Sequence, residues 1–118
     1  MLNENDINKI QKIIRDRKSS HNVLTKNSSV YNEFLKMEEA AFKSGNLDKK
    51  YKELIATGIS IAINCESCME WHINEALKSG ATYEEVMETV GVGIEMGGGP
   101  ATVSSRFALK VLEYYTQH

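Results

Sequence analysis

Apolar residues recur with the three-and-four spacing of an α-helix along nearly all of this 118-residue chain. Side chains at that spacing share one face of a helix, so each run can bury an apolar stripe against its neighbours. The alternation of apolar and polar residues that a half-buried strand requires is scarce, and the single proline stands at position 100. The pattern therefore predicts an all-α fold with about six helices.

Turn and capping residues indicate where the helices begin and end. The expected helices span about residues 5–18, 31–42, 49–63, 65–79, 83–96 and 101–115. Asp48 is the expected N-cap of the third helix, and Thr82 with Glu85 forms a capping box for the fifth. The glycine run before Pro100 is expected to be a tight helix–helix turn, since it lacks the lysine of a phosphate-binding loop.

Two stretches differ from the ordinary amphipathic pattern. Residues 19–29 are mostly polar, so they are expected to be a linker. Residues 1–28 would then be an N-terminal helix and linker, a candidate oligomer arm, and residues 29–118 the main domain. Residues 54–63 are apolar nearly all round, as in a helix buried at the centre of a bundle.

Composition and charge exclude several functions. The formal net charge is −2 and no basic stripe with interleaved aromatic residues occurs, so nucleic acid is not an expected partner. No run approaches the ~20 apolar residues of a membrane span, so a membrane is not expected either. The N-terminus is polar and acidic, unlike the start of a signal peptide. We therefore expect a cytoplasmic, reducing compartment, where a cysteine pair is more often catalytic or metal-binding than structural.

The only two cysteines of the chain stand three positions apart, at Cys65 and Cys68, and His72 follows one helical turn later. The pair falls at the expected start of the fourth helix. Unpaired backbone N–H groups and the helix dipole favour the thiolate form of a cysteine there. His72 can give and take protons near neutral pH, as thiol chemistry requires. The spacing therefore favours redox chemistry.

Glu53 is the nearest upstream carboxylate that could assist His72. On one continuous helix Glu53 would lie about 18 Å from Cys65. If the third and fourth helices instead fold back on each other at Asn64, Glu53 comes level with His72. The residues alone leave both arrangements open, as well as the ordinary role of a surface carboxylate. Glu70 is expected to lie in solvent near the start of its helix.

A metal site is the main alternative for the cysteine pair. The pair and its histidine could hold zinc or an iron–sulfur cluster, but a structural zinc site needs a fourth ligand. Glu53, His21 and His118 are the residues that could supply it. Because this supply is poor, we expect neither a metal nor another cofactor.

Several segments together resemble the carboxymuconolactone decarboxylase family, in its alkylhydroperoxidase D-like branch. The matching segments are residues 50–55 (KYKELI), 64–72 (NCESCMEWH), 75–82 (EALKSGAT) with Glu84 and Glu85, and 94–101 (IEMGGGPA). They cover most of the chain. The resemblance implies an all-helical alkylhydroperoxidase D-like domain that assembles as a homotrimer or homohexamer, with its active site near subunit contacts.

The resemblance also implies a role for each site residue. Cys68 would attack a peroxide, Cys65 would resolve the resulting sulfenic acid, and Glu53 with His72 would relay protons. One position departs from the founding members, which place a second histidine immediately before the second cysteine. Here that position is Ser67. The proton relay is therefore one histidine shorter than in the founding members. This difference is expected to reduce peroxidase activity more than disulfide exchange.

These features predict a thiol–disulfide oxidoreductase with peroxiredoxin-type, alkylhydroperoxidase-like activity. Its substrate would be a hydroperoxide or a small disulfide, and an external dithiol would return the electrons. The decarboxylase members of the family generally lack the cysteine pair and act on a lactone acid without a cofactor. Cofactor-free decarboxylation is therefore the alternative enzyme activity, and metal or cluster binding at the pair is the alternative without catalysis.

Overall fold

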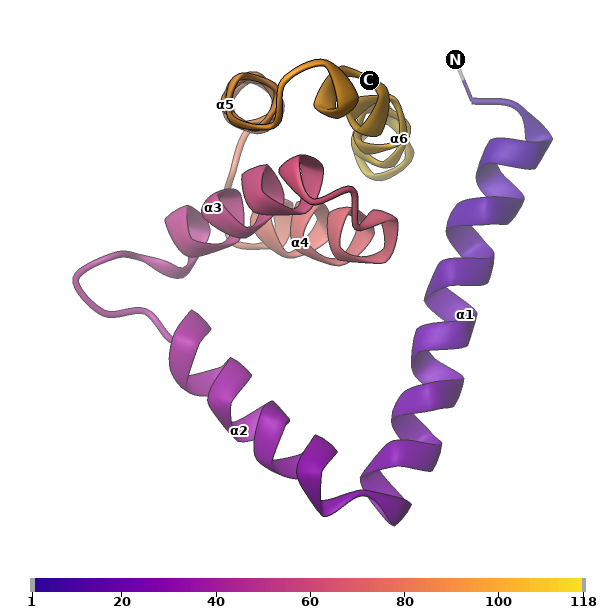
Figure 1. Cartoon of the computed structure of the whole chain (residues 1–118), viewed down its shortest axis with the longest axis vertical. Coiled ribbons are helices and arrows are strands. Elements are labelled where there is room, and N and C mark those ends of the chain that lie inside the picture. Colours follow the sequence, from indigo (N-terminus) through magenta and orange to yellow (C-terminus); the bar gives the residue numbers. More distant parts are fainter. Residues whose placement is uncertain (1, 118) are drawn as a thin grey trace.

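The computed structural model describes residues 2–117, and every regular element within that range is a helix (Figure 1). The helices are α1 (Glu4–Asn27), α2 (Ser29–Phe42), α3 (Lys49–Ala62), α4 (Glu66–Lys78), α5 (Tyr83–Gly97) and α6 (Gly99–Thr116). The all-α prediction is confirmed. No helix within residues 2–117 has the length and apolar character that a membrane crossing demands.

Helices α3 to α6 form a bundle, and α1 and α2 extend from it as the two arms of a V (Figure 1). α3 packs against α4, α5 and α6, and α6 also packs against α4 and α5. The large apolar side chains at the centre include Ile61, Met69, Ile73 and Val111. α1 contributes Ile10 to this core. The cysteine-bearing helix α4 is thus held from several sides.

Capping residues fix several helix ends. The capping box predicted for α5 is present, because Thr82 Oγ1 accepts the Glu85 N–H at 3.1 Å and Glu85 Oε1 accepts the Thr82 N–H at 2.9 Å. Asp48 is the N-cap residue of α3, as predicted, although its side chain makes no capping bond. Gly98, with a φ of 71°, turns the chain between α5 and α6. The predicted tight turn before Pro100 is therefore confirmed.

The prediction of a polar linker after the first helix is wrong, because α1 continues unbroken to Asn27. Residues 19–27 contain neither glycine nor proline. Their side-chain bonds to the preceding turn, such as Thr25 Oγ1 to the His21 carbonyl at 2.8 Å, are compatible with a helix. These residues are polar because this end of α1 projects away from the bundle (Figure 1). The division of the chain into an arm and a domain stays a prediction.

The prediction that residues 54–63 are buried on all sides is wrong for one face. α3 exposes a row of isoleucines that includes Ile55 and Ile59. Its buried face carries the core residues Leu54 and Ile61 together with polar side chains, among them Glu53 and Thr57. The buried Thr57 hydroxyl donates a hydrogen bond to the Glu53 carbonyl at 2.8 Å, so it has a hydrogen-bond partner. α3 therefore directs a carboxylate into the bundle beside its core residues, while the isoleucines of its other face are exposed.

Close packing at the end of α5 requires a residue without a side chain at Gly97. A Cβ atom there would lie 2.6 Å from Ala101 Cβ and 3.2 Å from Ala62 Cα. We expect Gly97→Ala to lower the free energy of unfolding, measured by urea denaturation, by about 1–3 kcal/mol. Gly91→Ala is the matched control on the same helix. A Cβ at Gly91 would meet no heavy atom within 4 Å, so this change should raise the free energy by about 0.5–1 kcal/mol. Equal effects of the two changes would contradict the packing.

Candidate active site

The cysteine pair lies where the chain turns from α3 into α4. Asn64 adopts the left-handed conformation, with a φ of 57°, which asparagine tolerates better than most residues. The Cys65 N–H then donates to the Ser60 carbonyl at 2.9 Å, and Cys65 is the N-cap residue of α4. This turn folds α4 back along α3 (Figure 1). Of the two arrangements left open by the sequence, the structure has the reversal at Asn64.

Cys65 and Cys68 are joined by a disulfide bond, with their Cα atoms 5.2 Å apart. Both residues are half-buried. Cys65 Sγ also accepts the Cys68 N–H at 3.2 Å, and Cys68 lies in the first turn of α4. Backbone N–H groups at a helix start stabilise negative charge, so this position favours a thiolate once the disulfide is reduced. The predicted placement of the pair at a helix start is confirmed.

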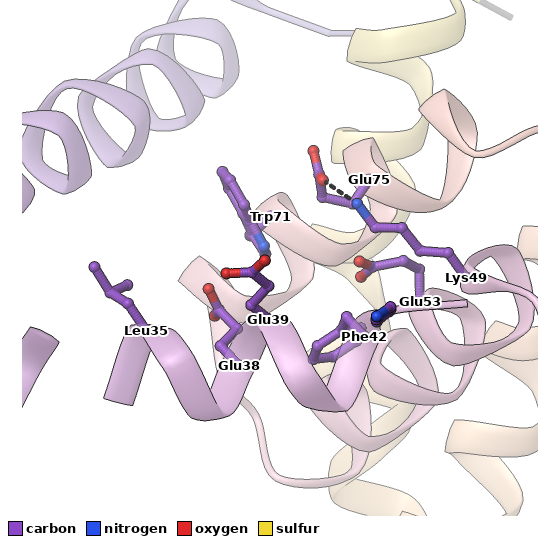
Figure 2. A pocket seen from close by; sticks show the side chains of 9 residues that line it. Leu35, Glu38, Glu39, Phe42, Lys49, Glu53, Trp71 and Glu75 are labelled. Carbon is purple, nitrogen blue, oxygen red and sulfur yellow. Dashed lines mark hydrogen bonds and ion pairs between the residues drawn. The ribbon is translucent and has the colours of Figure 1, made fainter. Parts of the chain in front are cut away.

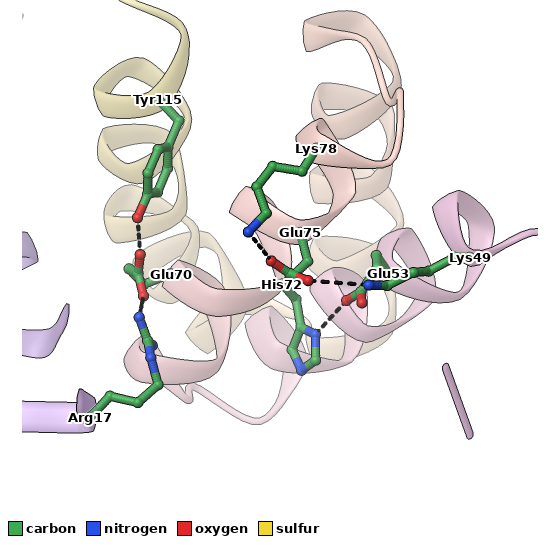
Figure 3. Close-up of polar contacts among 8 residues, drawn as sticks. All are labelled: Arg17, Lys49, Glu53, Glu70, His72, Glu75, Lys78 and Tyr115. Atoms are coloured by element: carbon green, nitrogen blue, oxygen red, sulfur yellow. Dashed lines mark hydrogen bonds and ion pairs between the residues drawn. The ribbon is translucent and has the colours of Figure 1, made fainter. Parts of the chain in front are cut away.

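His72 and Glu53 meet across the interface between α4 and α3. His72 Nδ1 lies 2.7 Å from Glu53 Oε1, and only 2% of Glu53 is exposed (Figure 3). This hydrogen bond orients the ring and leaves Nε2 as the nitrogen able to exchange a proton with a substrate. Phe42 of α2 stacks on the His72 ring, with the ring centroids 5.3 Å apart and the planes inclined by 20°. Glu53 and His72 thus adjoin the helical turn that holds Cys68.

A cleft of about 400 Å³ opens beside Glu53, between α2 and the α3–α4 pair (Figure 2). Lys49 Nζ lies 3.2 Å from Glu75 Oε1 in its wall, and Lys78 Nζ lies 2.7 Å from Glu75 Oε2 (Figure 3). Burial acts to raise the pKa of Glu75, but the hydrogen bonds from Lys78 and Lys49 outweigh it and hold the pKa below its usual value. Glu75 therefore stays ionised, and Trp71 provides an apolar wall of the same cleft.

Glu70 is fully buried, so the prediction that it lies in solvent is wrong. Its carboxylate accepts hydrogen bonds from Arg17 of α1 and from Tyr115 of α6 (Figure 3). Burial and the bond to Glu70 raise the pKa of the Tyr115 hydroxyl, which therefore stays protonated as a donor. The Arg17 guanidinium also lies over the Trp71 ring, 4.9 Å from its centroid. This network ties α1 and α6 to the helix that carries the cysteine pair.

Of the four residues singled out from the sequence, the structure joins Glu53 to His72 and Cys65 to Cys68, and His72 follows Cys68 by one turn on α4. Sequence reasoning missed Phe42 and Glu75. Phe42 belongs to an apolar stripe of α2, and nothing in that stripe indicates a contact with a histidine of another helix. Glu75 lies three positions after His72, and that helical spacing is the signal that could have found it.

The metal alternative gains no support from the part of the chain that the structure describes. Within residues 2–117, no group of three or more His, Cys, Asp and Glu side chains is arranged to hold a metal ion. His21, one candidate fourth ligand, instead lies with its Nδ1 2.8 Å from the Tyr31 hydroxyl oxygen. His118, another candidate, lies outside the described residues.

Comparison with known proteins gives a family match over most of the chain. Residues 29–111 match the model of the carboxymuconolactone decarboxylase family. The uncharacterised protein 4 in the cox locus of Paracoccus denitrificans is 37% identical over 86 residues, which is 73% of this chain and 78% of that protein. An uncharacterised protein of Cupriavidus necator is 38% identical over 77 residues, which is 65% of this chain and 66% of that protein.

Solved structures share the fold. A carboxymuconolactone decarboxylase family protein from Legionella pneumophila, in its apo form, matches with a TM-score of 0.86 at 35% identity, covering 92% of this chain and 97% of that chain. A family protein from Thermotoga maritima, described as possibly involved in an antioxidative response, matches with a TM-score of 0.83 at 24% identity. The match covers 90% of this chain and 91% of that chain. Fold and site together define an all-helical protein with a cysteine pair at the start of a central helix. The chain belongs to the carboxymuconolactone decarboxylase family, which includes enzymes.

Proposed function

We propose that this protein is a thiol–disulfide oxidoreductase that reduces hydroperoxides through Cys65 and Cys68. The observation that carries the proposal is the contact between His72 and Glu53, one helical turn from a cysteine pair close enough to form a disulfide. A buried carboxylate that orients a histidine near a thiol is suited to general acid–base catalysis. Family membership supports the proposal, and the role suggested for the Thermotoga maritima protein is of the same kind.

The proposed cycle begins with the reduced pair. The Cys68 thiolate attacks the terminal oxygen of a hydroperoxide; a sulfur–oxygen bond forms, the oxygen–oxygen bond breaks, and the alkoxide leaves as an alcohol with a proton from His72. The Cys65 thiolate then attacks the sulfur of the Cys68 sulfenic acid, so that the disulfide forms and hydroxide leaves as water. An external dithiol returns two electrons and two protons by thiol–disulfide exchange.

The assignment of the two thiols follows the family resemblance. Cys68 lies inside the first turn of α4, whereas Cys65 is the N-cap residue just outside it. Both sulfurs lie at the helix start, where unpaired N–H groups stabilise a thiolate, and the Cys68 N–H itself donates to Cys65 Sγ. Ser67 is exposed and stands where the founding members carry a histidine. In this chain the relay therefore consists of His72 and Glu53.

Cofactor-free decarboxylation of a carboxylactone is the alternative activity within the family. That reaction does not involve thiols, so it would survive replacement of both cysteines. Turnover of a carboxylactone by the Cys65→Ser/Cys68→Ser variant would favour the alternative. Thiol-dependent consumption of hydroperoxide, lost in the same variant, would favour the proposed oxidoreductase.

Glu53→Gln tests the proton relay, because it keeps the size of the side chain but removes the negative charge facing His72. We expect the rate constant for hydroperoxide reduction by pre-reduced protein to fall about 10²-fold, near the lower limit of what acid–base catalysis contributes. Stopped-flow measurement of thiol oxidation gives this rate. Glu39→Gln, a carboxylate change in the same cleft, is the matched control and should change the rate by less than about twofold. An unchanged rate in a folded Glu53→Gln variant would refute the relay.

A further inference from the structure

A second cleft opens inside the V that α1 and α2 form, and α4 and α6 complete its walls (Figure 1). Its volume is about 680 Å³, within the range of about 300–1,000 Å³ that small-molecule sites occupy. The residues of α1 that line it are Ile14, Arg17, Lys18, His21 and Asn22. They are spaced by three and four positions, so one face of α1 looks into the cleft over about two helical turns.

Aromatic rings from three helices line this cleft. Tyr31 and Phe34 belong to α2, Trp71 to α4 and Tyr115 to α6. Phe34 is 48% exposed, and the other three are half-buried. Such rings offer a large apolar contact area and stack on a flat ligand. The cleft is therefore suited to a molecule with an apolar, ring-containing body.

The cationic side chains on the α1 wall keep hydrogen-bonding capacity that the rest of residues 2–117 does not use. Arg17 donates through Nη2 to Glu70, but its Nη1 has no hydrogen-bond partner among the described residues. The Arg17 side chain is 27% exposed and lines the cleft. Lys18 is exposed and forms no ion pair within residues 2–117. Lys78 of the α4 wall, in contrast, is held by Glu75 at 2.7 Å. The α1 wall therefore offers donors to a ligand that brings acceptors.

The charges of the walls decide where such a ligand places its polar end. Glu38 of α2 lies where this cleft meets the cleft of the candidate active site, because Leu35, Glu38 and Trp71 line both (Figure 2). A carboxylate repels an anion, whereas Arg17 and Lys18 attract one. An anionic group therefore fits the α1 wall, and an apolar body fits the rings beside Trp71.

We propose that this cleft binds a small organic acid with an apolar, ring-containing body. The carboxylate of the ligand accepts hydrogen bonds from Arg17 and Lys18, and bonds between charged groups of this kind are stronger than those between neutral ones. The body of the ligand lies among Trp71 and the rings of α2. The proposed site is separate from the cysteine pair, and the inference does not depend on the redox activity.

The chain carries its own reporter of this cleft, because Trp71 is its single tryptophan. The experiment titrates the protein with phenylbutyrate, phenylbutanol and phenylbutylamine, which share one body and carry an anionic, a neutral and a cationic head group. We expect phenylbutyrate to change the Trp71 emission with a dissociation constant on the order of 1 mM or below, as its size allows. It should bind at least about tenfold more tightly than phenylbutylamine, with phenylbutanol between the two.

Two matched variants locate the anionic group. Lys18→Glu reverses a charge in the cleft wall, and Arg15→Glu reverses a charge at an exposed position of α1 that does not line the cleft. Both change the net charge equally, and circular dichroism should show unchanged helix content because both positions are exposed. Lys18→Glu should weaken phenylbutyrate binding about fivefold and Arg15→Glu less than about twofold, since an exposed charge acts mainly on its neighbours. Neither change should affect phenylbutanol.

Phe34→Ser tests the place of the apolar body, since it removes an exposed ring of the cleft and should weaken all three probes by a similar factor. Trp71 emission that shows no saturable change at about 10 mM phenylbutyrate would overturn the proposal. Equal affinity for phenylbutyrate and phenylbutylamine would contradict an anionic ligand. Equal weakening by Lys18→Glu and Arg15→Glu would place the binding outside this cleft.

Discussion

Replacing Cys68 with serine is expected to lower the rate of hydroperoxide consumption by at least about 10³-fold, because the proposed nucleophile is lost. Serine has nearly the same size, so the half-buried position at the start of α4 should keep its packing. The measurement is peroxide consumption with dithiothreitol as electron donor. A variant that still consumes peroxide at the natural rate would exclude Cys68 as the attacking group.

Cys65→Ser gives the complementary result, since Cys65 is the proposed resolving thiol. This variant should consume one peroxide per chain quickly and leave a Cys68 sulfenic acid that dimedone traps, which mass spectrometry detects. Turnover should then depend on direct reduction of that acid by the external thiol. Rapid formation of the dimedone adduct on Cys65 in Cys68→Ser, with no adduct on Cys68 in Cys65→Ser, would reverse the assignment of roles.

Arg17→Ala is expected to have the largest effect on stability, lowering the free energy of unfolding by about 3 kcal/mol. Glu70 is fully buried, and its described partners are Arg17 and Tyr115. Removing the guanidinium leaves a buried carboxylate without a cation and also removes the contact with the Trp71 ring. Because part of the Arg17 side chain reaches solvent, the low end of the range for a broken buried pair applies.

The measurement is chemical denaturation at neutral pH, with Arg15→Ala as the matched control. Arg15 lies on the same helix but is exposed, so its replacement should change stability by no more than about 0.5 kcal/mol. The double variant Arg17→Met/Glu70→Leu should recover much of the loss, because no unpaired charge stays buried. A loss below about 1 kcal/mol in Arg17→Ala would show that the network does not anchor α1.

The sequence predicted those parts of the fold that depend on local chemistry. The Thr82–Glu85 capping box, the turn before Pro100 and the helix start at Cys65 all follow from side chains within a few positions of one another. The meeting of Glu53 with His72 required only one further fact, the reversal at Asn64. The family resemblance made that meeting an expectation.

The features that could not be predicted depend on tertiary packing. The polar end of α1 is helical because it projects from the bundle, which composition alone does not reveal. Ile59 is exposed although its helix reads as buried all round, since no other element of residues 2–117 covers that face. Glu70 is buried because Arg17 and Tyr115, distant in sequence, converge on it. A charge pattern along one helix carries no information about such partners.

Counting thiols after a single addition of oxidant tests the redox assignment most directly. Fully reduced protein, held without oxygen, receives one molar equivalent of cumene hydroperoxide, and its free thiols and mass are then measured. We expect Cys65 and Cys68 to lose their thiols together, with the peroxide consumed and the mass lowered by two hydrogen atoms, as an intramolecular disulfide requires. Two thiols that persist beside unconsumed peroxide would contradict the proposed function.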